Sequence, residues 1–295
     1  MRELNFCYAA NDNFAPHMAV SITSLLENNN SHNIAVHILH ADLSDASMQR
    51  IMSFENRYKN ARIFFYKIGE AKFEKFSLSI PHVTKETYFR YLIPNILQDA
   101  DRVLYLDADT VLNADISDLF KIDISEYYCA GVRDILVEKS GYARELGISG
   151  LYINAGVMLL NLCKMRSDGS VERLMQITSE KRFKFQDQDA FNVVFNGKIK
   201  ELDCVYNFKR AHQKAFREKA ELAKIIHYVG PSKPWLKFSI NKHKRLYFKY
   251  KKISPYRREK IKVALLVDEY FGAWKTAYGG YGFLAREIVS KHLPA

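Results

Sequence analysis

Two carboxylates follow an apolar run in this sequence, at a spacing that suits metal chemistry. Val103 to Leu106 are apolar or aromatic, and Asp107 and Asp109 come next, two positions apart. At the end of a strand, this spacing points both side chains to one side. Two carboxylates on one side repel each other unless a cation lies between them. The pair therefore predicts a divalent-metal site.

A histidine, a glycine and a lysine lie close together further along the chain. His227 ends a predicted strand, Gly230 permits close approach of a ligand, and Lys233 lies six residues after the histidine. Imidazole can complete an oxygen-rich Mn²⁺ site, and a lysine can neutralise phosphate. A single histidine at a strand end is more often structural, so both interpretations stay open.

Two other polar clusters have the chemistry of a nucleotide-sugar site. Residues 8–14 form an Asx-rich turn after the first predicted strand, and such a turn can offer hydrogen bonds to a base or ribose. Such turns are also common for conformational reasons alone. Residues 186–189 place four amide or carboxylate side chains at a helix start, where Asp187 can act as a helix cap. The same concentration of donors and acceptors suits the hydroxyls of a sugar.

The elements that must position these residues alternate along the chain. The patterns predict strands at 4–9, 34–39, 62–67, 102–106, 129–132, 156–161 and 224–228, and helices at 16–26, 45–54, 87–97, 169–179 and 187–195. Repeated strand–helix–strand units predict a mostly parallel sheet covered on both faces. Pro94 is expected to bend or end the helix at 87–97. Asp107 and Asp109 would then lie at the carboxyl edge of the sheet, where ligands bind.

Length and composition indicate an ordered globular protein. The 295 residues suffice for one large α/β domain with an extension, and 48% of them are hydrophobic. Four cysteines without a Cys-x-x-Cys pair predict reduced core thiols. We expect no signal peptide and no transmembrane segment, because no apolar run approaches the roughly 20 residues that span a bilayer. These features predict a cytoplasmic protein.

The net charge of +11 is concentrated in one segment. Residues 237–262 contain eleven Lys or Arg and one Glu, a net charge of +10, together with several aromatic residues. We expect a catalytic domain at 1–236 and a basic, aromatic tail at 237–295. This composition suits an anionic lipid surface, while nucleic acid is the rival partner and a solvated basic face is the simplest alternative.

Together, these clusters resemble glycosyltransferase family 8, the retaining enzymes of the glycogenin and lipooligosaccharide galactosyltransferase type. The resemblance covers roughly residues 4–235 and follows the order of the family's motifs. These motifs are the Ala-Ala-x-Asp-x-like opening, the arginine of Tyr88-Phe89-Arg90-Tyr91, the Asp-x-Asp pair, Tyr152-Ile153-Asn154-Ala155-Gly156-Val157, Asp187-Gln188-Asp189 and the His-x-x-Gly-x-x-Lys-Pro-Trp segment. The lipooligosaccharide branch of this family also ends in a basic, membrane-associating tail.

The resemblance implies a GT-A fold, a Rossmann-like mixed sheet flanked by helices, that binds a UDP-sugar with Mn²⁺ or Mg²⁺. It implies metal ligands at Asp107, Asp109 and His227, and diphosphate contacts at Gly230 and Lys233. Nucleotide and donor contacts would come from Ala9, Asn11, Asn13, Arg90, Asp107 and Ala108, and the catalytic sugar site from Asn154, Asp187 and Gln188. His82 and Asp134 match positions near the acceptor. The family often has an acid where this chain has Asn11, which makes the role of that position less certain.

The implied reaction moves galactose or glucose from a UDP-sugar to a glycan, with lipooligosaccharide, lipopolysaccharide or another lipid-linked glycan as acceptor. We expect no nucleic-acid partner, and a peripheral location on the inner face of a bacterial cytoplasmic membrane. An amide oxygen is a poor nucleophile, so we favour front-face attack with Gln188 supporting positive charge at the anomeric carbon. Two alternatives remain: a haloacid dehalogenase-like phosphatase with Asp107 as nucleophile, and a non-catalytic carbohydrate-binding protein on the same scaffold.

Overall fold

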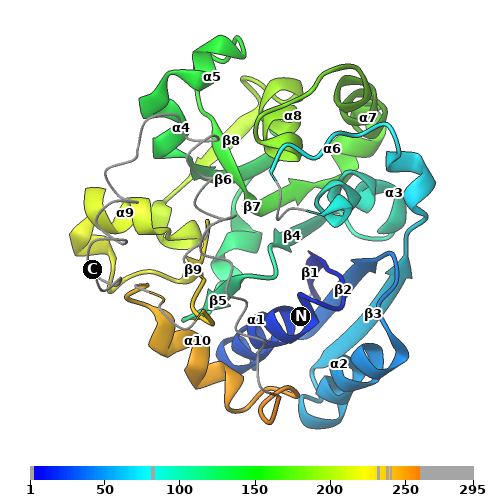
Figure 1. The fold of residues 1–295 in the computed structure, drawn as a ribbon, viewed down its shortest axis with the longest axis vertical. Coiled ribbons are helices and arrows are strands. Elements are labelled where there is room, and N and C mark those ends of the chain that lie inside the picture. The colour runs from blue at the N-terminus through cyan, green and yellow to red at the C-terminus, as the bar shows by residue number, and fades with distance from the viewer. Residues whose placement is uncertain (1–2, 81–83, 231–232, 237–238, 240, 260–295) are drawn as a thin grey trace, which may run out of the picture.

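A mixed seven-stranded sheet forms the centre of the molecule (Figure 1). The computed structural model describes residues 3–80, 84–230, 233–236, 239 and 241–259. Within these residues the strand order is β3-β2-β1-β4-β7-β6-β8. The strands are β1 (Leu4–Ala9), β2 (Ile34–His40), β3 (Ala61–Lys67), β4 (Arg102–Leu106), β6 (Cys129–Arg133), β7 (Ile153–Asn161) and β8 (Ile199–Leu202).

Strand direction divides this sheet into two parts. The first four strands, from β3 to β4, are parallel, as expected for Rossmann-like units. β7 runs antiparallel to both β4 and β6, and β8 is parallel to β6. A second sheet pairs β5 (Thr110–Leu112) with β9 (Ile225–His227) in antiparallel fashion. The predicted α/β class with a mixed sheet is confirmed.

Helices cover both faces of the central sheet because its strands are apolar on both sides. In β1, Phe6 and Tyr8 join one buried cluster and Cys7 the other. The first cluster packs under α1 (Ala15–Asn28) and α2 (Asp45–Arg57). On the other side lie α3 (Ile93–Ile96), α6 (Leu162–Ser167), α7 (Ser170–Glu180) and α8 (Gln186–Val194).

The remaining elements are short. They are α4 (Ile135–Ser140), α5 (Tyr142–Glu145), α9 (Arg210–Ala215) and five 3₁₀ helices among the described residues: η1 (Glu70–Phe73), η2 (Lys85–Leu92), η3 (Ser117–Lys121), η4 (Cys204–Asn207) and η5 (Arg217–Lys219). The segment predicted to be helical at 87–97 is helical in two consecutive parts, since η2 ends at Leu92 and α3 begins at Ile93, next to Pro94. Pro94 lies in the first turn of α3, where its missing N–H leaves no hydrogen bond unmade.

The helix α10 (Lys244–Lys251) packs along α1, as Figure 1 shows. The hydroxyl of Tyr247 lies 2.7 Å from Nδ1 of His17, and Asn28 Nδ2 donates to the hydroxyl of Tyr250 at 2.7 Å. Both tyrosines belong to the same buried cluster as α1 and α2. The described part of the basic tail therefore shares a core with residues before 236, and the domain division at 236–237 stays a prediction.

All four cysteines are free, which agrees with the prediction of reduced thiols. Cys7, Cys129 and Cys204 are buried, but Cys163 is exposed and is not a core residue. In the part of the chain that the structure describes, no helix is both long and apolar enough to cross a bilayer.

Candidate active site

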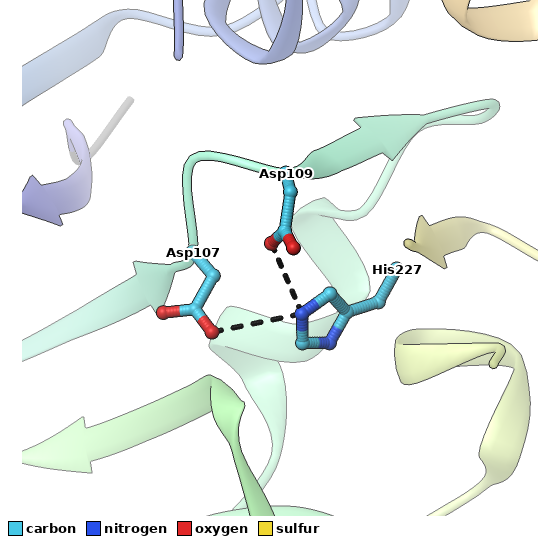
Figure 2. A group of neighbouring side chains, drawn as sticks. All are labelled: Asp107, Asp109 and His227. Carbon is cyan, nitrogen blue, oxygen red and sulfur yellow. Dashed lines mark ion pairs between the residues drawn. The ribbon is translucent and has the colours of Figure 1, made fainter. Parts of the chain in front are cut away.

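Asp107, Asp109 and His227 form a cluster at the carboxyl edge of the sheet, as Figure 2 shows. The three groups come together because β5 pairs with β9 and sets Thr110 opposite His227. His227 Nε2 lies 3.1 Å from Asp109 Oδ1 and 3.6 Å from Asp107 Oδ2. One ligand atom from each residue lies within 4.8 Å of the others. Two carboxylates and an imidazole suit a divalent metal such as Mn²⁺.

Gly156 on β7 makes room for this cluster. Its carbonyl accepts a hydrogen bond from the Asp107 N–H at 2.8 Å, so the two backbones lie in contact. A Cβ at residue 156 would lie 2.1 Å from His227 Cε1 and 2.5 Å from Asp107 Oδ2, distances that real atoms do not adopt. The cluster thus requires glycine at this position, which supports its fit to a metal held between the strands.

Lys233 reaches the cluster from the segment after β9. Its Nζ donates to Asp109 Oδ2 and, at 2.8 Å, to the carbonyl of Tyr228. Burial by itself would raise the pKa of Asp109, but the Lys233 ammonium and His227 hold that pKa well below its usual value. Asp109 is therefore an ionised carboxylate in a buried place. The lysine thus places a positive charge directly beside one carboxylate of the cluster.

Arg90 connects the cluster to the opposite end of the cleft. Its guanidinium donates to Asp107 Oδ1 at 3.0 Å and to the carbonyl of Ala155 at 2.7 Å, and its Nε lies 3.2 Å from Asp187 Oδ2. The guanidinium carbon also lies 4.2 Å from the centre of the Tyr105 ring. With two carboxylates as partners, the pKa of Arg90 is raised despite its burial. Arg90 therefore stays charged and fixes both acids.

Asp187 faces the cleft and does not cap its helix. Its Oδ1 accepts a hydrogen bond from Thr87 Oγ1 at 2.5 Å, while Asp189 Oδ2 accepts the N–H of Phe185 at the start of α8. The cap interpretation of Asp187 is therefore wrong. Burial raises the pKa of Asp187 to about 6, although the Arg90 guanidinium opposes part of that rise.

Gln188 is held by polar groups on β7 and on Tyr152, the residue before that strand. Its Oε1 accepts from Asn154 Nδ2 at 2.8 Å and from the Ala155 N–H at 3.2 Å, and its Nε2 donates to the Tyr152 hydroxyl at 3.2 Å. An amide oxygen with two N–H donors has both lone pairs engaged. The side chain is thus fixed in one orientation.

These residues line one cleft with a volume of about 230 Å³. The structure brings most of the predicted site residues together there, including the metal cluster and the sugar-site residues. Those lining the cleft are Ala9, Asn11, Arg90, Asp107, Ala108, Asp109, Asn154, Asp187, Gln188, His227, Gly230 and Lys233.

Three predicted residues do not join this set. Asn13 is exposed and is not among the residues that line the cleft. Asp134 is buried and does not line the cleft, and Lys209 Nζ donates to its Oδ2 at 3.0 Å. His82 lies outside the described residues, between Ile80 and Thr84, which both line the cleft. The roles given to these three residues stay predictions.

Two further residues, Gly156 and Asn207, belong to the site without having been predicted there. Gly156 was part of a quoted motif, but its contact with His227 depends on the pairing of distant strands. Gln186, the first residue of the polar cluster predicted at 186–189, is buried, adopts a left-handed backbone with a φ of 51°, and lines the cleft. Asn207 is fully buried, with its Oδ1 2.9 Å from His227 Nδ1, and no spacing in the sequence indicates that contact.

Comparison with known proteins identifies relatives of this chain. A sequence model of the family described as Glycosyl transferase family 8 matches residues 5–239. A putative glycosyltransferase of Haemophilus influenzae is 29% identical over 244 residues, which are 79% of this chain and 73% of that protein. The lipopolysaccharide 1,2-glucosyltransferase of Escherichia coli K12 is 29% identical over 288 residues, 92% of this chain and 84% of that protein.

Solved structures share this architecture. The galactosyltransferase LgtC, determined in complex with donor and acceptor sugar analogs, matches with a TM-score of 0.77 and 25% identity. The match covers 85% of this chain and 96% of LgtC. This likeness confirms the predicted GT-A fold.

Proposed function

Because the chain belongs to glycosyl transferase family 8, we propose that it transfers a hexose, galactose or glucose, from a UDP-sugar to a glycan acceptor. One observation carries this proposal: a single cleft contains the Asp107–Asp109–His227 cluster, Lys233 and the Arg90–Asp187 pair. One end of such a cleft would offer a metal ion and the Lys233 ammonium to a diphosphate, and the other end would offer polar groups to a sugar. We set aside the phosphatase interpretation of Asp107, because the family match extends across both ends of the cleft.

Asp107, Asp109 and His227 would hold a divalent metal, with Mn²⁺ as our first choice. When bound, such a metal supplies Lewis-acid stabilisation of the charge that develops on the UDP leaving group. Lys233 would add a positive charge to the diphosphate as the sugar–phosphate bond breaks. Ala9 and Asn11 would meet the uridine, since both line the cleft beside the carboxyl end of β1.

Arg90, Asp187, Asn154 and Gln188 would bind and orient the donor sugar. We propose that the reaction retains configuration by front-face attack, with a departing phosphate oxygen taking the proton of the acceptor hydroxyl. The two hydrogen bonds to Gln188 Oε1 support this route, because they make the amide oxygen a still poorer nucleophile. A covalent glycosyl adduct trapped on Gln188 or Asp187 would overturn this mechanism.

The acceptor we propose is a lipid-linked glycan such as lipopolysaccharide or lipooligosaccharide. The relative from Escherichia coli named as a lipopolysaccharide glucosyltransferase supports this class, and 92% of the present chain aligns with it. Exposed basic side chains on α10 support a peripheral position at an anionic membrane surface, on the inner face of a bacterial cytoplasmic membrane.

A panel of UDP-sugars tests the proposed activity. Each donor is incubated with the purified full chain and Mn²⁺, and slow release of UDP by donor hydrolysis is measured without any acceptor. We expect UDP-galactose or UDP-glucose to be hydrolysed faster than the other donors. Failure of every UDP-sugar, with the metal bound, would favour the non-catalytic carbohydrate-binding alternative.

A further inference from the structure

A line of hydrogen-bonded side chains runs beneath the cleft from the metal cluster to the sugar end. His227 Nδ1 lies 2.9 Å from Asn207 Oδ1, and Asn207 Nδ2 donates to Asn154 Oδ1 at 3.0 Å. Asn154 Nδ2 then donates to Gln188 Oε1 at 2.8 Å, and Gln188 Nε2 to the Tyr152 hydroxyl. These side chains come from β9, η4, β7, α8 and, for Tyr152, the residue before β7, so only the folded structure joins them.

Backbone donors fix the direction of every bond in this line. The N–H of Ala155 donates to Gln188 Oε1, and the N–H of Gly156 donates to Asn154 Oδ1 at 3.3 Å. A backbone N–H can only donate, so both side-chain oxygens must face these groups. Asn154 Oδ1 then also accepts from the amino group of Asn207, which leaves the Asn207 oxygen to face His227.

The orientation of Asn207 in turn decides which nitrogen of His227 carries a proton. An amide oxygen can only accept, so Nδ1 of His227 must be the nitrogen that bears hydrogen. Nε2, which faces Asp107 and Asp109, is then the nitrogen left for a metal. Outer partners of this kind fix the tautomer and ring orientation of metal-ligating histidines.

Burial makes these bonds expensive to lose. Asn207 and Tyr152 are 0% exposed, His227 is 4% exposed and Asn154 is 7% exposed. A buried polar group without a partner costs about 1–3 kcal/mol, so no side chain in the line can turn over alone. Both partners of the Asn207 amide are side chains of the site, whereas the buried amide of Asn29 bonds backbone groups of Leu25 and Ile116.

We propose that Asn207 is a positioning residue that couples the metal ligand His227 to Asn154 and Gln188. The orientation of its amide sets the nitrogen that His227 offers to the metal, and the same amide holds Asn154, whose Nδ2 in turn holds Gln188 Oε1 at the donor-sugar site. The part of this inference that concerns Gln188 rests on the proposed function. The part that concerns His227 depends only on the metal cluster.

Two substitutions separate the two halves of this coupling. Asn207→Leu removes both bonds and should weaken Mn²⁺ binding by about 10- to 100-fold. Asn207→Asp keeps an acceptor for His227 Nδ1–H but sets an oxygen against Asn154 Oδ1. It should therefore retain Mn²⁺ affinity within about threefold while the kcat for donor hydrolysis falls by about tenfold or more.

Asn29→Asp is the matched control, since Asn29 is as fully buried as Asn207 and lies away from the cleft. It should lower the melting temperature and leave Mn²⁺ affinity and kcat unchanged. Mn²⁺ affinity is measured on each full-length variant by electron paramagnetic resonance with Mn²⁺ alone, and kcat by UDP release. Thermal unfolding identifies any variant that fails to fold. If Asn207→Leu does not fold, the Mn²⁺ affinity and kcat of Asn207→Asp test the inference alone.

Wild-type Mn²⁺ affinity in Asn207→Leu would overturn the inference. The coupling would also be overturned if Asn207→Asp and Asn207→Leu lost Mn²⁺ affinity and kcat to the same extent. A wild-type kcat in Asn207→Asp would overturn it too. If the wild-type protein hydrolyses no UDP-sugar but Asn207→Leu still loses Mn²⁺, the proposed function fails and the role of Asn207 at the metal ligand stands.

Discussion

At the scale of single residues, the proposed metal site of Asp107, Asp109 and His227 depends on Gly156 as much as on these three side chains. A Cβ at residue 156 would overlap His227 and Asp107, and His227 cannot retreat because it is 4% exposed and bonded to Asn207. We expect Gly156→Ala to weaken Mn²⁺ binding by about tenfold or more, the range found when the surroundings of metal ligands are disturbed. A Mn²⁺ titration by electron paramagnetic resonance measures the change.

Gly131→Ala is the control for that substitution. Gly131 also lies on a strand of the central sheet, and a Cβ there would meet Ile153 Cδ1 at 2.5 Å, the movable end of a side chain. This variant should lose stability and keep its Mn²⁺ affinity. Equal Mn²⁺ affinities in Gly156→Ala and wild type would show that the cluster does not bind metal between these strands.

Asp187 gives the site a pH dependence. Burial raises the pKa of its carboxyl to about 6, against the opposing effect of Arg90. An acid is charged above its pKa, so its ion pair with Arg90 is present above about pH 6 and is lost as the pH falls below that value. We expect kcat/KM for donor hydrolysis to fall about tenfold per unit below about pH 6, at saturating Mn²⁺.

Asp187→Asn lacks the titrating group and should show a low rate without that decline. A pH profile of kcat/KM from about pH 5 to about pH 8 compares the two proteins. A wild-type profile that stays level through about pH 5 would count against an ionised Asp187 in the donor site.

The sequence predicted the residues of this site that belong to recognisable motifs. Asp107, Asp109 and His227 were predicted together, and the structure sets them within reach of one ion. Gly156 and Asn207 were not assigned to the site, because their roles depend on which strands become neighbours and not on spacing along the chain. Asp187 was predicted for the sugar site and also as a helix cap, and the cap is wrong because Phe185 occupies the N-cap position of α8.

At the scale of elements, the short strands β5 and β9 complete the site. Their pairing brings His227 to Asp109 across more than a hundred residues of sequence. The strand at 224–228 was predicted, but β5 has only three residues and no periodic pattern that would reveal it. A strand this short is defined mainly by its partner, and the sequence pattern therefore missed β5 although it indicated the strand opposite it.

The structure also shows how α10 is anchored on α1, a contact that the sequence did not predict. The Tyr247 hydroxyl is buried against Nδ1 of His17, and the His17 ring stacks on Trp235 at 3.5 Å between ring centres. Tyr247→Phe leaves His17 Nδ1 buried without its partner, so we expect a loss of about 1–2 kcal/mol in the free energy of unfolding. Urea denaturation measures this loss.

Phe248→Ala serves as the reference on the same helix. Phe248 is 40% exposed, and its truncation should change the free energy of unfolding by about 0.5 kcal/mol or less. If Tyr247→Phe were as stable as wild type, α10 would not be anchored through this hydroxyl.

At the scale of the whole molecule, α10 has a basic side that is exposed and an aromatic side that packs against the core. Tyr247 and Tyr250 face the core, while Arg245, Lys249 and Lys252 are exposed. Charge reversal of these three to Glu should weaken binding to vesicles with anionic headgroups by about a hundredfold or more, at about 1 kcal/mol for each basic residue. Vesicle sedimentation measures the effect, and donor hydrolysis should persist.

A control with the same change in net charge places Glu at Lys59, Lys67 and Lys72, which are exposed and distant in sequence from α10. It should bind the vesicles like wild type. Equal binding by both triple variants would contradict an orienting role for α10. Charge reversal is preferable to deletion after residue 236, because deletion would also remove Tyr247 and Tyr250 from the core.

The fold as a whole was predictable because long apolar strands alternate with amphipathic helices in the first half of the chain. Four of the strands there, from β1 to β4, were predicted within one residue at each end. The antiparallel placement of β7 between β4 and β6 follows from tertiary packing, which strand patterns do not encode. β7 carries Asn154, Ala155 and Gly156, which line the cleft. The strand whose placement the sequence does not encode therefore contributes directly to the site.

The dependence of UDP-sugar hydrolysis on Mn²⁺, compared between the wild type and Asp109→Asn, tests the central claim most directly. Asp109 is buried and ionised, and its neutral amide counterpart would bind a divalent cation far more weakly. We predict Mn²⁺-dependent UDP release by the wild type, and a loss of at least about a hundredfold in a folded Asp109→Asn protein. Near-normal, Mn²⁺-dependent turnover in Asp109→Asn would contradict the account.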